Sequence, residues 1–97
     1  MLLNDFEFSI HANDVIKERK ISEKWISDAL NNPDWNIVKE DGNLHYFKNI
    51  SENNGRVLHV VVNHNASPKR IVTVYFDRKY KRIKQVETNP NPDLENI

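Results

Sequence analysis

The sequence has no cysteine, only two glycines and no long apolar run. Without cysteine the chain can form no disulfide and offers no thiolate ligands to zinc. No stretch approaches the roughly 20 apolar residues of a membrane-spanning helix, and the first residues lack the basic and apolar regions of a signal peptide. With two glycines there is no glycine-rich phosphate loop. These absences favour a cytoplasmic protein that has neither a metal centre nor a cofactor.

The net charge is zero, but the charges are unevenly distributed along the chain. Residues 69–84 contain seven basic side chains against one acid, Asp77, whereas residues 85–97 contain three acids and no base. The basic run is either a solvated strand end or an edge that contacts phosphate. A chain of 97 residues predicts one domain. We assign residues 1–83 to it, and residues 84–97, rich in proline and asparagine, to a disordered acidic tail.

Helical periodicity occupies the first third of the chain. Ser9 is a suitable N-cap for a helix over residues 10–20, and Ser22 for a second helix over residues 23–31. Pro33 then ends the helical pattern. Residues 2–8 either add a short strand or pack beneath the helices.

After Pro33 the hydrophobic period changes from 3.6 to 2 residues, which indicates strands. Four strands are expected, with turns between them, at residues 35–40, 44–50, 56–64 and 70–78. The predicted fold is therefore α+β, with two N-terminal helices on one face of a four-stranded antiparallel meander sheet.

Side-chain alternation divides the strand residues between a face beneath the helices and an open face. On the last two strands we expect the open face to carry His59, Ile71, Thr73 and Tyr75. The register of the 44–50 strand is not determined by its sequence. It places either His45 or the pair Tyr46 and Lys48 on the open face.

The chain contains the side-chain types that cleave RNA without a metal. Histidine or tyrosine can move protons, arginine or lysine can stabilise the charge on the phosphate, and an aromatic ring can stack a base. The RNA supplies its own nucleophile, the 2′-hydroxyl. The catalytic candidates are His11, Arg19, Lys48, Thr73 and Tyr75. The candidates for substrate binding are His45, Tyr46, His59 and Arg78.

Arg19 is the most informative of these residues, because it falls in the middle of the apolar side of the first helix, with Ala12, Val15 and Ile16. An unpaired cation inside a core costs several kcal/mol. Arg19 must therefore pair with an acid such as Glu23 or Asp28, reach helix-end carbonyls, or extend to a polar site.

Four segments together resemble a bacterial family. They read FSIHANDVIKERKISEKWISDALNNPD, NLHYFKNI, RVLHVVVN and RIVTVYFDR, and span about residues 8–78. In order and spacing they resemble domain-of-unknown-function family 4258, which is similar to the RelE-like and BrnT-like toxins of toxin–antitoxin pairs. The resemblance implies a RelE/barnase-like fold and RNA-cleaving or translation-blocking activity. It points to His11, Arg19, Tyr46, Lys48, Thr73 and Tyr75 as site residues.

These observations lead to two main functional hypotheses, beside a third, that of a structural or immunity-like protein. The first is the toxin of a type II toxin–antitoxin pair, a metal-independent endoribonuclease that cleaves RNA through the 2′-hydroxyl. It implies RNA as substrate, a cognate antitoxin bound in a heteromeric complex, and no membrane partner. The second is a non-catalytic module that binds protein through the open sheet face or a sheet edge.

Overall fold

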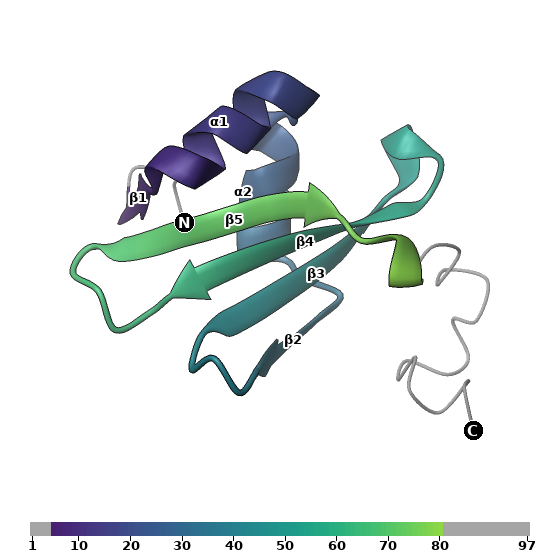
Figure 1. Cartoon of the computed structure of the whole chain (residues 1–97). Coiled ribbons are helices and arrows are strands. Elements are labelled where there is room, and N and C mark those ends of the chain that lie inside the picture. Colours follow the sequence, from purple (N-terminus) through teal and green to yellow (C-terminus); the bar gives the residue numbers. More distant parts are fainter. Residues whose placement is uncertain (1–4, 81–97) are drawn as a thin grey trace.

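The computed structural model describes residues 5–80 as two helices beside one sheet (Figure 1). The elements in chain order are β1 (Phe6–Phe8), α1 (Ile10–Arg19), α2 (Glu23–Asn31), β2 (Trp35–Val38), β3 (Leu44–Ile50), η2 (Ser51–Asn53), β4 (Arg56–Asn63), β5 (Lys69–Phe76) and η3 (Arg78–Tyr80). The two helices and the four long strands lie where the sequence predicts them, within two residues at each end.

Ser9 begins α1 and also attaches it to the sheet. Its Oγ accepts a hydrogen bond from the Ala12 N–H at 3.0 Å and donates one to the carbonyl of Val72 in β5 at 2.8 Å. Lys20 ends the helix in the left-handed conformation, with φ 55°, and its N–H bonds to the carbonyl of Ile16. The N-cap prediction is confirmed, and the cap places α1 along β5 (Figure 1).

The second N-cap prediction is also confirmed, since the Ser22 hydroxyl accepts from the N–H of Lys24. The apolar stripe of α2, which contains Ile26, Ala29 and Leu30, is buried against the sheet. This helix therefore supplies much of the core on its side of the molecule.

The sheet corrects the predicted topology. It has five strands in the order β1-β5-β4-β3-β2, and β1 pairs with β5 in parallel, Phe6 opposite Lys69 and Phe8 opposite Ile71. The expectation of a four-stranded, wholly antiparallel sheet is wrong, because the three-residue β1 is too short to show a period-two pattern. β1 pairs with β5 only as far as Ile71. The part of β5 after Ile71 therefore has no neighbouring strand on that side among the described residues.

Both helices cover the same face of the sheet, as predicted. The buried core joins Ala12, Ile26 and Leu30 to strand residues such as Val60 and Val74. The side opposite the helices is called the open face below.

A bulge corrects the predicted face of Ile71. The register between β4 and β5 shifts between Val61 and Val62, so that Thr73 lies opposite Val61 and Ile71 opposite Val62. The extra residue, Val72, reverses the alternation, and Ile71 is fully buried beneath the helices instead of lying on the open face.

The sequence left the register of β3 undetermined, and in the structure this register places His45 on the open face. Phe47 of β3 lies opposite His59 of β4, and His45 opposite Val61. Tyr46 lies opposite Val60 and therefore faces the helices, and Lys48 shares that side because strand residues alternate.

Some predictions fall outside residues 5–80. The acidic tail, residues 84–97, lies there, as does the end of the basic run, Lys81, Arg82 and Lys84. Within the described residues, neither helix is long and apolar enough to cross a membrane.

Candidate functional site

A line of four polar side chains crosses the open face from one end of the sheet to the other. His45 Nδ1 lies 2.8 Å from His59 Nε2. His59 Nδ1 lies 2.9 Å from an oxygen of Asp77, and His45 Nε2 lies 3.1 Å from an oxygen of Asp41. We call these four residues the histidine chain. It ties the β2–β3 turn, β3, β4 and the end of β5 together.

The contact with Asp77 determines which ring nitrogen of neutral His59 carries the proton. Asp77 accepts from His59 Nδ1–H, which leaves His59 Nε2 to accept from His45 Nδ1–H. His59 is then neutral. Burial lowers its pKa, the nearby His45 lowers it further, and the hydrogen bond to Asp77 opposes both effects. The other ring nitrogen of His45, Nε2, lies 3.1 Å from an oxygen of Asp41.

Aromatic rings screen the histidine chain from water. The Phe47 and Tyr75 rings lie 4.2 and 4.8 Å from the His59 ring, centroid to centroid. Trp35 stacks on Phe47 at 4.6 Å, and Tyr80 contacts both rings edge-on. His59 is only 2% exposed and His45 only 6%. Neither imidazole can touch a large substrate, so we assign both a structural role.

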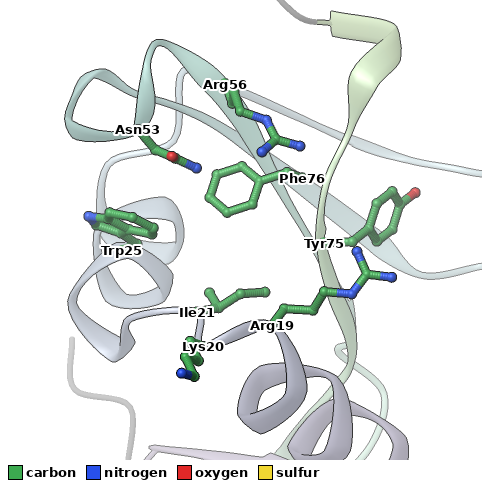
Figure 2. Close-up of a pocket in the computed structure, with 8 residues that line it drawn as sticks. All are labelled: Arg19, Lys20, Ile21, Trp25, Asn53, Arg56, Tyr75 and Phe76. Carbon is green, nitrogen blue, oxygen red and sulfur yellow. The ribbon is translucent and has the colours of Figure 1, made fainter.

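A hollow of about 320 Å³ lies beside the part of β5 that has no neighbouring strand (Figure 2). The end of α1, the first turn of α2, η2, the start of β4 and the end of β5 enclose it. Tyr75 borders it from the open face, and Phe76 from the face beneath the helices. The lining residues are Arg19, Lys20, Ile21, Trp25, Asn53, Arg56, Tyr75 and Phe76.

Among residues 5–80, three cations and no carboxylate line the hollow. Arg19, Lys20 and Arg56 form no salt bridge with any acid among residues 5–80. Other cations in this part of the chain do, as in the pairs Lys24–Asp28, Lys48–Asp34 and Arg70–Glu7. Concentrated, unneutralised positive charge beside aromatic rings is typical of a site for a phosphate ester.

Aromatic contacts hold two walls of the hollow in place. The edge-on pair of Trp25 and Phe76 has centroids 5.7 Å apart. The Arg56 guanidinium lies 5.1 Å from the centroid of the Phe76 ring, a cation–π contact that orients it (Figure 2). Across the hollow, the Arg19 side chain extends toward Tyr75 (Figure 2).

The Tyr75 ring stands at the rim of the hollow with its hydroxyl pointing away from Trp25 and Phe76 (Figure 2), and 38% of the residue is exposed. Partial burial raises its pKa, and electrostatic interactions with Asp77 and Tyr80 raise it further. The hydroxyl therefore keeps its proton at neutral pH. Tyr75 can donate a proton to a leaving group but is a poor base.

Of the predicted catalytic residues, Arg19 and Tyr75 both line the hollow. Thr73 lies on the open face two residues before Tyr75 and is half-buried. His11 is exposed in the first turn of α1 and does not line the hollow. At 1.5 Å per residue it lies about 12 Å along the helix from Arg19.

The remaining predicted residues lie away from the hollow. Tyr46 packs against the core, where burial raises its pKa. Lys48 lies 3.9 Å from an oxygen of Asp34. Arg78 is exposed in η3, and His45 and His59 belong to the histidine chain.

Sequence reasoning missed Arg56, Asn53 and Trp25 as site residues. Asn53 and Arg56 flank the β3–β4 connection, and no hydrophobic period relates that connection to the end of a helix. No local sequence signal singles out Arg56, because Glu52 stands only four residues before it. Asp41 and Asp77 were also missed as histidine partners, because pairing across strands depends on register.

Among the described residues, no group of three or more histidine, cysteine, aspartate or glutamate side chains is arranged to hold a metal ion. Two clusters of polar side chains have been described. The groups of the histidine chain are buried and paired with one another, whereas the cations of the hollow are accessible to a ligand.

Comparison with known proteins gives one match. No curated protein and no solved structure matches the chain. One family profile, described as "Domain of unknown function (DUF4258)", matches residues 8–76, which include α1, α2 and all strands from β2 to β5. Because this match covers more than half of the chain, the protein belongs to that family of unknown function.

Proposed function

We propose that this protein is a metal-independent endoribonuclease and the toxin component of a type II toxin–antitoxin pair. The observation that supports the proposal best is the hollow, which is lined by three cations without an acid partner among residues 5–80 and has a protonated tyrosine at its rim. A phosphodiester needs positive charge for its non-bridging oxygens and a proton donor for its leaving oxygen. Arg19 and Tyr75 supply both.

In the proposed reaction the RNA 2′-oxygen attacks the adjacent phosphorus while its proton passes to water. The bond from phosphorus to the 5′-oxygen breaks, and that oxygen takes the proton of Tyr75. Tyr75 then regains a proton from solvent. The products are a 2′,3′-cyclic phosphate and a 5′-hydroxyl end.

Arg19 stabilises the extra negative charge on the phosphate oxygens as the new bond forms. A guanidinium fork can contact two of these oxygens at once, which a lysine cannot do. The histidine chain holds Tyr75 in place, since the His59 ring packs against the Tyr75 ring. The imidazoles themselves take no proton from the substrate in this scheme.

The test is cleavage of a labelled single-stranded RNA in the presence of a chelator. We expect the parent protein to produce 2′,3′-cyclic phosphate ends, and a substrate with 2′-deoxyribose at the cleaved position to stay intact. Tyr75→Phe should lower the rate about a hundredfold or more, because a general acid contributes about 10²–10⁴-fold. Arg70→Ala is the matched control, since Arg70 lies outside the hollow beside Glu7. Cleavage that requires metal, or survives in Tyr75→Phe, contradicts the proposal.

The antitoxin part of the proposal has its own test. Expression of the chain alone should arrest growth, and co-expression of a small protein encoded beside it should restore growth and co-purify with it. Arg19→Ala should express without harm. Growth arrest by the Tyr75→Phe and Arg19→Ala variants at the parent level would count against RNA cleavage as the cause.

One observation favours the second function, a protein-binding module. β2 is an edge strand with two exposed apolar residues, Ile37 at 44% and Val38 at 61%. Such an edge can accept a strand from a partner. If the neighbouring gene product binds, yet RNA stays intact and Ile37→Lys abolishes binding, this function replaces the ribonuclease.

A further inference from the structure

We propose that the hollow is a pocket for one unstacked nucleotide of single-stranded RNA, with its base against Trp25 and its phosphate beside Arg19. The inference rests on the proposed function in taking RNA as the ligand. It goes further by assigning the strandedness of the substrate and the residues that read its base.

The phosphate end of this pocket is the side where Arg19 and Tyr75 lie together (Figure 2). Neither Arg19 nor Arg56 has an acid partner among residues 5–80, so a phosphate group need not compete with a carboxylate for either guanidinium. The Arg56 guanidinium, held over Phe76, reaches the same hollow from the opposite wall. A phosphodiester between these two walls would be contacted from both sides.

The base end is the side that Trp25 lines. Trp25 is half-buried, and its edge-on contact with Phe76 limits the positions that its indole ring can take. A fixed indole beside a cationic recess is a suitable platform for a nucleobase, because base–aromatic stacking tolerates any base while a basic surface binds the backbone.

Asn53 is placed to distinguish one base from another. Its side-chain amide lines the hollow and forms no hydrogen bond with any other residue of the 5–80 range. The turn that follows is held by two left-handed residues, Asn54 with φ 60° and Gly55 with φ 73°. An amide can donate to and accept from one base edge, and the adenine N6–N7 edge matches it best. We therefore expect adenine to be preferred in this pocket.

The shape of the hollow favours a single strand. Its walls come from the end of α1, the start of α2, η2 and β5, so a base must enter it as an individual ring. In a duplex the bases are stacked and paired, and A-form RNA presents mainly phosphates and 2′-hydroxyls to a protein. A duplex can therefore touch the rim cations but cannot fill the pocket.

The experiment uses Trp25 as its own reporter. Trp35→Phe leaves Trp25 as the single tryptophan and keeps an aromatic ring on Phe47. Short 2′-O-methyl RNA oligonucleotides, which cannot be cleaved through the 2′-oxygen, are titrated in single-stranded form and as a blunt duplex. We expect saturable quenching of Trp25 fluorescence by the single strand, and binding of the duplex at least tenfold weaker.

Variants then assign the roles within the pocket. Asn53→Ala should reduce the preference for an oligoadenylate over an oligouridylate to less than twofold. Arg56→Ala should weaken binding of both about tenfold, and Arg70→Ala should change neither by more than about twofold. Thermal melting of each variant checks that it is folded. Equal affinity for single strand and duplex, binding without quenching of Trp25, or an unchanged base preference in Asn53→Ala overturns the pocket.

The outcome separates the pocket from the proposed ribonuclease. If the 2′-O-methyl strand binds as expected but ordinary RNA is never cut, the pocket stands and the cleavage proposal fails. If ordinary RNA is cut through its 2′-hydroxyl while Trp25 and Asn53 do not respond, cleavage stands and the pocket is wrong.

Discussion

The histidine chain and the hollow lie close together at the end of β5, yet they differ in whether their polar groups have partners within the protein. In the chain, every ring nitrogen of two nearly buried imidazoles has a partner within 3.1 Å. In the hollow, three cations have no acid partner among the described residues. Burial accounts for the difference, because an unpaired polar group inside a protein costs far more than one at the surface.

This difference indicates which region is available to a ligand. The hydrogen-bonding groups of the chain are already used to join three strands and a turn. The cations of the hollow still have their hydrogen-bonding capacity and their charge, and solvent reaches them. The first region should therefore govern stability, and the second should govern binding.

The largest expected effect of a single substitution is on stability, from His59→Ala. It removes a buried ring, leaves a cavity beside Phe47, and deprives His45 and Asp77 of their partner. We expect the free energy of unfolding to fall by about 3 kcal/mol, measured by urea denaturation. His64→Ala is the control, because His64 is exposed in the β4–β5 turn and should change stability by less than about 0.5 kcal/mol. Similar losses in the two variants would refute the structural role of the histidine chain.

Acid should open the histidine chain. The folded state lowers the pKa of His59 chiefly through burial, so below the ordinary histidine pKa of about 6.5 the unfolded chain binds more protons than the folded one. Stability is then present above that pH and declines as the pH falls. An additional proton would also set two N–H groups against each other across the 2.8 Å contact. Urea midpoints between pH 8 and pH 5 measure the decline, and a midpoint that rises toward pH 5 contradicts it.

The two acids of the histidine chain should differ from each other. Asp77→Asn removes the charge from a side chain that is 14% exposed and should cost about 1–2 kcal/mol. Because the Asp77 charge also contributes to the raised pKa of Tyr75, the same variant should lower that pKa, measured by ultraviolet titration. Asp41→Asn should cost less than Asp77→Asn, since the Asp41 side chain is 47% exposed and water can replace the carboxylate. The reverse order would show that the turn contact is the stronger one.

The smallest expected effect on stability comes from the hollow. Arg19→Ala removes an exposed cation that has no acid partner in the described part of the chain. The free energy of unfolding should therefore change by less than about 0.5 kcal/mol, measured by urea denaturation. RNA binding by the same variant should fall about tenfold. A large loss of stability with unchanged binding would reverse the comparison between the two regions.

Much of the secondary structure was predictable because its signals are local. Ser9, Ser22 and Pro33 mark helix ends by capping and by ring constraint, and the period-two pattern marks β3, β4 and β5. β1 was left undecided because three residues show no period. The bulge at Val72 was not predicted, because an extra residue in one strand is recognised only when the partner strand is known.

The candidate site was predictable only in part. Arg19 attracted notice as a cation among apolar residues, and Tyr75 as a polar ring on the open face. Their meeting at one hollow, with Arg56 and Trp25, depends on how α1 lies along β5 and on where the β3–β4 connection folds back. His11 shares a helix with Arg19 but lies about two turns away along the axis.

The sequence by itself determined the helix ends, the strand segments and the residue types available for chemistry, because each depends on neighbours a few positions away. Only the tertiary structure decided that His45 meets His59, that Ile71 turns inward, and that three cations line one hollow without an acid partner from residues 5–80. The physical reason is register. A shift of one residue between strands moves every side chain to the opposite face, and packing of the whole sheet selects among those registers.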